Sequence, residues 1–300
     1  MPIVSVCVTT YNLESYISEA LDSLLKQQTQ YSFEIVICDD CSRDKTCSII
    51  KKYQLEFPNK IRLIEAEKNL GMLPNFIKSL NAAQGKYIAV CDGDDYWIDP
   101  FKLEKQVSFL ESNSDFSACY GNSYVLNQET GEKIIAKNQI WDVANSEELL
   151  LHDDFKVDNV PLSPGHISAF VFRNVLQNNY PKWFYEVDGV TDFPLYLMLS
   201  KFGKAKFINE PLSVYRIHSK STSTVEYEYL RVTRGRIFMY EQLNLFLDQK
   251  FKTQIQSLIN RHYLRIAKIH LKNKHFYKSF VALMKVFFSE PTLILKTRVK

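Results

Sequence analysis

The 300-residue sequence predicts an α/β protein, with a mostly parallel, Rossmann-like sheet flanked by helices and a helical extension at its C-terminal end. Two observations predict this class. Apolar, β-branched runs alternate with helical patterns through residues 1–110, which is the order of a parallel sheet. In addition, three of these runs end in polar clusters, as expected where ligands bind beyond the carboxyl ends of parallel strands.

The elements follow from periodicity. Residues 3–10 are apolar and β-branched, as in a buried parallel strand, and residues 13–28 show helical spacing. In the same way we expect strands at 33–38, 61–64 and 87–91 and helices at 44–56 and 74–84, with Pro74 in a permitted first-turn position. Beyond them we expect helices at 99–112, 191–202, 226–248 and 252–288 and strands at 116–126, 166–172 and 205–216, with a less regular segment at 127–165.

The predicted domain organisation has one domain at 1–225, divided into halves at 1–110 and 111–225, and a basic extension at 226–300. Residues 251–300 contain eleven Lys or Arg but a single acid, Glu290, whereas the whole chain has a net charge of only +3. Such a tail suggests an anionic partner. Two interpretations stay open: an amphipathic helix on a membrane, or a helical hairpin packed on the domain or on a second subunit of a homo-oligomer. The tail contains no recognised nucleic-acid-binding module, so no nucleic-acid partner is expected.

The sequence indicates a cytoplasmic location, because it lacks both a long uncharged apolar stretch and a secretory signal. Cys7, Cys38 and Cys91 fall in predicted strands, where a thiol acts as a small apolar group. Cys38 and Cys41 form one CxxC spacing, but no second CxxC follows, which disfavours zinc or redox chemistry.

The most informative segment follows the strand at 87–91, where Asp92, Asp94 and Asp95 surround Gly93. Like charges this close repel one another, and a hard divalent cation would neutralise them. Magnesium or manganese held by one or two carboxylates completes its shell with water and phosphate oxygens. The alternative is an ordinary polar turn, since Asp and Gly are common turn residues.

Two other strand ends are also polar, at Thr9–Asn12 and at Asp39–Asp40. Parallel strands bring their carboxyl ends to one edge of the sheet, so these clusters should converge with the carboxylates. Together they predict a nucleotide-type site with a metal ion.

Three ordered motifs carry a family resemblance: SVCVTTYN at 5–12, EIVICDDCSRDKT at 34–46 and GKYIAVCDGDDYW at 85–97. With them the chain resembles family 2 glycosyltransferases, which have the GT-A fold and invert the anomeric centre. Weaker matches to this family lie at Thr191–Asp192 and in the segment 215–221. The resemblance ends near residue 225 and leaves out the basic tail.

The resemblance implies a role for each matching residue in donor binding. Asp40 would accept hydrogen bonds from the donor's base or ribose, with Asp39 beside it, while Thr9 and Tyr11 would line the base pocket. Asp92 and Asp94 match the family's DxD motif, which binds Mn²⁺ or Mg²⁺. Asp94 is then the direct ligand, and Asp92 lies nearer the ribose.

The second half of the resemblance implies further roles. His218 would bind the metal or a phosphate, with an ordinary surface histidine as the alternative. Arg216, Lys220 and Ser221 would hold the diphosphate through charge-assisted contacts. The segment Pro164–His166 would border the acceptor pocket.

Asp192 matches the family's catalytic base, which removes the proton of the attacking acceptor hydroxyl. The alternative is that Asp192 only starts a helix, where an acid is favoured by the helix dipole. Thr191 stands where the family often has Glu, so Glu186 and Asp188 are the substitutes if this alignment is wrong.

The expected function is metal-dependent transfer of a sugar, with inversion, from a nucleotide-diphosphate donor, taken as a UDP-sugar, to a saccharide or lipid-linked acceptor. Such a reaction would serve cell-surface polysaccharide biosynthesis, in the cytoplasm or peripherally on the inner face of the plasma membrane. One alternative is a nucleotidyltransferase, although the loop after the first strand lacks the glycine and lysine of a phosphate loop. The other is a sugar-nucleotide-binding protein without turnover, which intact Asp94 and Asp192 disfavour.

Overall fold

The computed structural model describes residues 1–136, 156–157, 160–161, 165–177, 179–219 and 229–290. Within this part the strands are β1 (Val4–Thr10), β2 (Phe33–Asp39), β3 (Ile61–Glu65), β4 (Tyr87–Asp92), β5 (Tyr96–Trp97), β6 (Phe116–Asn127), β7 (Lys133–Ile135), β8 (Lys156–Val157), β9 (Val160–Pro161), β10 (Phe170–Arg173) and β11 (Lys204–Ile217). Lys220, Ser221 and Pro164 lie outside the described residues, as does most of the irregular segment predicted at 127–165.

The α-helices of the described part are α1 (Ile17–Leu25), α2 (Thr46–Glu56), α3 (Met72–Ala82), α4 (Lys102–Ser112), α6 (Phe193–Leu199), α7 (Tyr229–Phe246), α8 (Lys252–Lys272) and α9 (Phe276–Ser289). Two 3₁₀ turns, η1 (Ile167–Ala169) and η2 (Lys182–Glu186), precede β10 and α6. Among the described helices, none combines the length and the apolar character needed to span a bilayer.

The main sheet has the strand order β3-β2-β1-β4-β10-β6-β11-β5, and β7 pairs with β6. The first four strands are parallel, as predicted, so the carboxyl ends of β1, β2 and β4 lie at one edge. Strand β10 is antiparallel to both of its neighbours, while β6 and β11 are parallel to each other. The mostly parallel sheet predicted from the sequence is therefore present.

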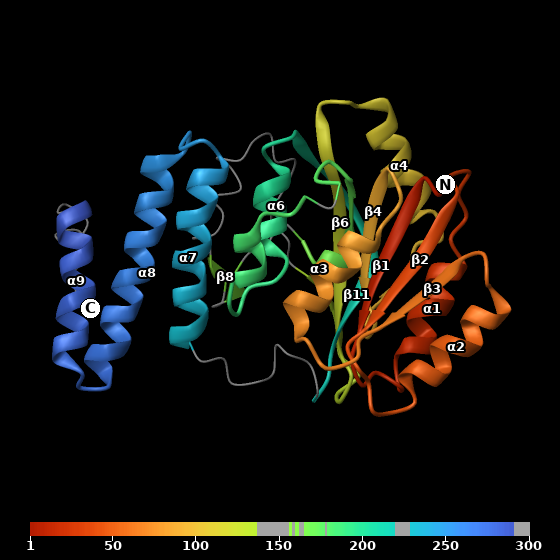
Figure 1. Cartoon of the computed structure of the whole chain (residues 1–300), viewed down its shortest axis with the longest axis horizontal. Helices are drawn as coiled ribbons and strands as arrows, with labels where there is room; N and C mark the ends of the chain where they lie inside the picture. The colour runs from red at the N-terminus through yellow and green to blue at the C-terminus, as the bar shows by residue number, and fades with distance from the viewer. Residues whose placement is uncertain (137–155, 158–159, 162–164, 178, 220–228, 291–300) are drawn as a thin grey trace.

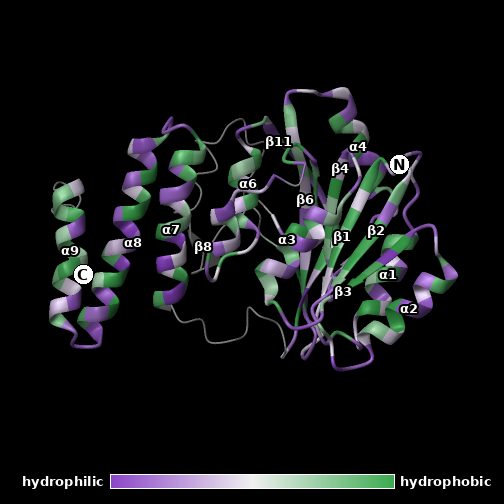
Figure 2. Ribbon diagram, viewed as in Figure 1, coloured by the Kyte–Doolittle hydropathy of each residue, from purple (hydrophilic) through white to green (hydrophobic). Residues whose placement is uncertain are grey.

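Two apolar cores lie on opposite faces of this sheet (Figures 1 and 2). On one face, buried side chains of α1 and α4, such as Leu21 and Val107, share a core with side chains of β1, β2, β6 and β10, and α4 lies against β6 and β10. Those of α3, α6, α7 and α8 form the other core, to which Phe76 and Leu197 belong. Burial on both faces explains why the strands are continuous apolar runs.

Two expectations about single elements are wrong. The strand predicted at 166–172 begins only at Phe170, because the His166 side chain accepts a hydrogen bond from the Ser168 amide and closes the turn η1. The helix predicted at 252–288 is two helices. Lys274 has a positive φ of 60°, and the His275 amide donates to the His270 carbonyl, which is the hydrogen bond that ends a helix in a Schellman motif. Strand β5 was not predicted at all.

Candidate active site

The polar strand ends converge as the sequence predicted. Thr9 pairs with Asp92 across β1 and β4, and its Oγ1 donates to Asp92 Oδ1 at 2.9 Å. Thr10 pairs with Asp39 across β1 and β2, and its Oγ1 donates to Asp39 Oδ2 at 2.8 Å. Each threonine of β1 thus orients a carboxylate of a neighbouring strand.

Asp39 and Asp40 are both buried and both hold loop backbone in place. Asp39 accepts hydrogen bonds from the amide and the hydroxyl of Ser42, at 2.8 and 2.6 Å. Asp40 accepts from the amides of Leu70 and Gly71, at 2.6 and 2.9 Å. These contacts fix the loops that follow β2 and precede α3. Tyr11, in the loop after β1, is 43% exposed, so its ring is accessible.

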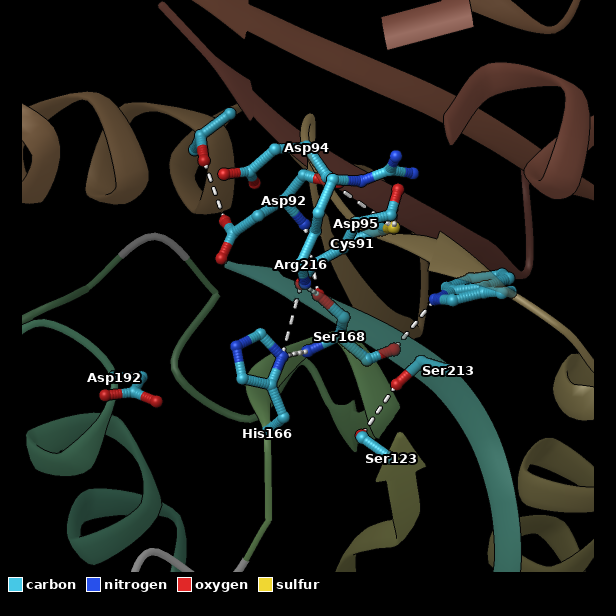
Figure 3. A network of polar contacts seen from close by, with 12 residues as sticks. Cys91, Asp92, Asp94, Asp95, Ser123, His166, Ser168, Asp192, Ser213 and Arg216 are labelled. Atoms are coloured by element: carbon cyan, nitrogen blue, oxygen red, sulfur yellow. Dashed lines mark hydrogen bonds and ion pairs between the residues drawn. The ribbon is translucent and has the colours of Figure 1, made fainter. Parts of the chain in front are cut away.

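The turn after β4 separates its three carboxylates (Figure 3). Gly93 is required there, because a Cβ would lie 2.7 Å from Thr10 Cγ2 and 2.9 Å from the Thr9 carbonyl oxygen. Asp92 and Asp94 are partly exposed, whereas Asp95 is buried beneath the turn. The tight turn therefore presents two carboxylates outward and one inward.

Asp94 meets His218, which follows the last strand of the sheet. Asp94 Oδ2 lies 3.1 Å from His218 Nε2, and the Tyr16 ring stacks on the His218 ring with 4.5 Å between centroids. His218 is buried, so it is not an ordinary surface histidine. One carboxylate oxygen and one imidazole nitrogen at this separation are a donor pair that suits a divalent cation.

Asp95 makes a different set of contacts. Its Oδ2 accepts from Ser168 Oγ at 2.5 Å, and its Oδ1 accepts from the Arg216 amide at 2.9 Å. His166 Nδ1 lies 3.3 Å from Asp95 Oδ2. Asp95 therefore ties the turn to the segment before β10 and to the end of β11.

The pKa values of the side chains in and around the turn reflect the crowding of the three carboxylates. Burial and the neighbouring Asp94 charge raise the pKa of Asp92 to about 7. Burial and the same charge raise the pKa of Asp95 well above its ordinary value. Burial lowers the pKa of His166 to about 4, which makes that imidazole neutral at pH 7. A cation beside Asp92 and Asp94 would relieve the repulsion that these shifts record.

Two donor sets compete for such a cation within the described residues. One is Asp94 with His218. The other is Asp92, Asp95 and His166, whose donor atoms all lie within 4.8 Å of one another. Because both Asp95 oxygens already accept hydrogen bonds, the second set would have to break contacts that hold the turn. We therefore favour Asp94 and His218, with Asp92 beside them.

The Arg216 guanidinium binds the backbone of the same turn. Its Nη2 lies 2.6 Å from Glu19 Oε2, its Nη1 donates to Gln128 Oε1, and its Nε donates to the Asp94 carbonyl oxygen. It also lies over the Tyr16 ring. These contacts orient the turn, and they join α1 to the end of β11.

Asp192 immediately precedes α6, and its side chain does not cap that helix. Its Oδ2 accepts a hydrogen bond from Tyr196 Oη at 3.1 Å. Burial raises the pKa of Asp192, and the Asp192 charge in turn contributes to the raised pKa of Asp92, so the two carboxylates belong to one region (Figure 3). A carboxylate with a raised pKa, near a cation site, is suited to accept a proton.

The two substitutes for Asp192 lie elsewhere. Glu186 and Asp188 line a cavity of about 680 Å³ beside α7, and Asp188 pairs with Arg231 at 2.8 Å. None of the three carboxylates of the β4 turn lines that cavity. This separation favours Asp192.

Sequence reasoning missed Tyr16, Glu19 and Ser168, which support His218, Arg216 and Asp95, respectively. Tyr16 and Glu19 lie in an amphipathic helical pattern without a motif of their own. Only Ser168, two residues after the noted His166, carried a local signal.

The family model described as glycosyl transferase family 2 matches residues 5–173, which is more than half of the chain. The chain belongs to glycosyltransferase family 2. Residues 5–173 contain all three motifs on which the resemblance was based, together with the β4 turn.

Several relatives align over most of this chain. An uncharacterized protein of Mycobacterium tuberculosis is 33% identical over 219 residues, which are 73% of this chain but 59% of that relative. The chain thus spans less than two thirds of that relative's length. An Escherichia coli protein named UDP-Glc:alpha-D-GlcNAc-diphosphoundecaprenol beta-1,3-glucosyltransferase WfaP is 28% identical, over 77% of this chain and 83% of its own.

The fold agrees with a solved structure of a distant protein. S. aureus TarS 1–349, crystallised in complex with UDP-GlcNAc, superposes with a TM-score of 0.62 at 16% identity, over 96% of this chain and 92% of that one. At this identity the match concerns the fold alone. The GT-A fold expected for family 2 is confirmed.

The different roles of Asp94 and Asp95 in the β4 turn predict different effects of their substitution on the free energy of unfolding. Asp95→Ala leaves the Arg216 amide and the Ser168 hydroxyl without their buried acceptor, so we expect a loss of about 2–4 kcal/mol in the free energy of unfolding. Asp94→Ala removes a partly exposed carboxylate next to two others, so we expect a change within about 0.5 kcal/mol. Urea denaturation measures both. Equal losses would contradict the assignment.

Proposed function

We propose that this chain is an inverting, metal-dependent glycosyltransferase. It would transfer a sugar from a UDP-sugar to a saccharide or lipid-linked acceptor in cell-surface polysaccharide biosynthesis. The observation that carries the proposal is the pairing of Asp94 with His218 at the carboxyl edge of the sheet. Family membership supports sugar transfer, and the site supplies the reason for metal dependence.

The donor set fits Mn²⁺ or Mg²⁺. Asp94 and His218 would hold the ion, with Asp92 beside it and nearer the donor ribose. Such an ion binds phosphate oxygens readily and neutralises the charge that develops on a departing diphosphate. The hydrogen bond from Thr9 keeps the Asp92 carboxylate oriented for this role.

The remaining donor contacts are assigned to the loops after β1, β2 and β11. Tyr11 would offer its exposed ring to the base, with Thr9 at the floor of the pocket. Asp39 and Asp40 would shape this pocket mainly through the loops that they hold, and Asp40 would also face the base or ribose. Lys220 would complete the diphosphate side, whereas Arg216, whose buried guanidinium is bound to Glu19, Gln128 and the Asp94 carbonyl, would act there only by holding the turn.

Asp192 would act as the base. In an inverting transfer the acceptor hydroxyl attacks from the face opposite the leaving group, and a carboxylate within hydrogen-bond reach takes its proton as the new bond forms. The raised pKa makes Asp192 a better proton acceptor than an exposed aspartate. The Tyr196 hydroxyl would hold the carboxylate in one orientation.

The choice of substrates draws on relatives. The name of WfaP includes a UDP-sugar donor and a diphosphoundecaprenol acceptor, and the TarS structure contains UDP-GlcNAc. We propose a UDP-sugar for this chain by analogy. We also propose residues 1–110 as the donor half, 111–225 as the acceptor half and 226–300 as a basic helical extension, whose helices α7 and α8 share one core with α3 and α6.

Two variants should distinguish the residues needed for metal-dependent nucleotide binding from those needed for turnover. We expect UDP to raise the melting temperature of the wild type more with Mn²⁺ than without it, since a ligand of the folded state stabilises that state. Asp94→Ala should remove the Mn²⁺-dependent part, whereas Asp192→Asn should keep it and lower transfer from a UDP-sugar about 10²- to 10⁴-fold.

A thermal-shift series with UDP, GDP, CDP and ADP, followed by a donor-hydrolysis or transfer assay, measures these effects. Asp115→Ala is the matched control, because this exposed carboxylate forms an ion pair with Lys204 and takes no part in the β4 turn. A wild type that no nucleoside diphosphate stabilises through Mn²⁺ would contradict the proposal.

The pH dependence tests the base. Because Asp192 must be ionised, activity should fall as the pH drops through its pKa, which lies above the ordinary value of an aspartate. Tyr196→Phe removes a hydrogen bond that favours the carboxylate, so the pKa should rise further and the acidic limb of kcat/KM should move to higher pH. An unchanged limb in Tyr196→Phe would count against Asp192 as the base.

A further inference from the structure

The last helix of the described chain is attached along one side only. Helix α9 is the outermost element in Figure 1 and packs against α8. Its buried residues are small or β-branched: Ser279, Ala282 and Val286. Ser279 Oγ donates to the Ala267 carbonyl at 2.9 Å, so the two helices form a defined hairpin.

The side chains that α9 turns away from α8 are large and apolar. Phe276, Tyr277, Phe280, Val281, Phe287 and Phe288 are between 41% and 79% exposed. Their helical spacing places them on one continuous face, opposite to the small residues that contact α8. We call these six residues the α9 face. A contiguous apolar surface of this kind marks a binding surface.

The lysine and arginine side chains of the same hairpin are not balanced by acidic residues. Residues 252–289 contain eight Lys or Arg and no Asp or Glu. Lys274 lies in the α8–α9 turn just before Phe276, and Lys278 and Lys285 lie between the aromatic residues of α9. All three lysines are exposed. By helical spacing Lys278 and Lys285 lie along one border of the α9 face, and Lys285 Nζ donates to Tyr263 Oη of α8 at 2.9 Å. An aromatic face bordered by lysines is the composition of helices that lie in the interface of an anionic bilayer.

We propose that the α9 face docks this protein on the surface of a bilayer that contains anionic lipids. The aromatic side chains would enter the region between headgroups and acyl chains, while the lysines would remain at the headgroups. Each basic residue near such a surface is attracted to it, and the hairpin offers eight.

A second copy of the chain fits this surface less well. Two α9 faces in contact would bring two hairpins with eight positive charges each against one another, and neither hairpin has an acid to pair with them. An anionic lipid surface supplies that compensating charge. The proposal goes beyond the proposed function and does not depend on it, because lipid binding can be measured without turnover.

The test is flotation of the full chain with vesicles of phosphatidylcholine alone or mixed with phosphatidylglycerol. We expect the wild type to float with the mixed vesicles and at least tenfold less with phosphatidylcholine. The double variants Phe276→Ser/Phe280→Ser and Lys274→Glu/Lys278→Glu should each lower the partition coefficient at least tenfold. All four residues are exposed, so the melting temperature should stay unchanged.

Matched controls change the same kinds of residue elsewhere. Leu55→Ser/Ile134→Ser removes two apolar side chains of similar exposure, and Lys52→Glu/Lys133→Glu changes the net charge equally. Both controls should float like the wild type. The proposal is overturned if the wild type does not float with anionic vesicles, or if the α9 variants float like their controls. A wild-type dimer that Phe276→Ser/Phe280→Ser dissociates, without vesicle binding, would assign the α9 face to a second copy instead.

Discussion

The repulsion among three carboxylates in one turn is the constraint on which the rest of the site depends. Asp92, Asp94 and Asp95 lie within four residues at the end of β4, and burial strengthens their interaction. The fold resolves the conflict by giving each a different environment. Asp95 is enclosed by hydrogen-bond donors, Asp92 is oriented by Thr9, and Asp94 faces an imidazole. Only Asp92 and Asp94, which are partly exposed, still need a cation to neutralise their charges.

The two halves of the sheet contribute different parts of this arrangement. Parallel strands β1, β2 and β4 bring the first polar loops to one edge. The turn after β4 is tight because position 93 has room only for a glycine. Strand β11 then returns to the same edge and delivers Arg216 and His218. Arg216 links this strand to Glu19 of α1, so the end of β11 and helix α1 are joined beside the turn.

The parallel half could be predicted because each of its strands is an apolar run that ends at a polar loop, a pattern that is local in the sequence. Strand β5 could not be predicted, since two residues have no periodicity and their partners in β11, Ser213 and Val214, are more than a hundred residues later in the sequence. The sequence grouped Asp92, Asp94 and Asp95 together, and only tertiary contacts identify Asp95 as the internal one. The internal contacts of Asp40 with Leu70 and Gly71 are likewise invisible in a sequence pattern.

The most direct test of the central claim is a crystal structure of the chain with Mn²⁺ and UDP, in which anomalous scattering locates the ion. The account predicts one manganese bound to Asp94 and His218, with diphosphate oxygens in its shell, while Asp95 keeps its hydrogen bonds to Ser168 and to the Arg216 amide. Manganese bound by Asp95 and His166, with His218 turned away, would contradict it.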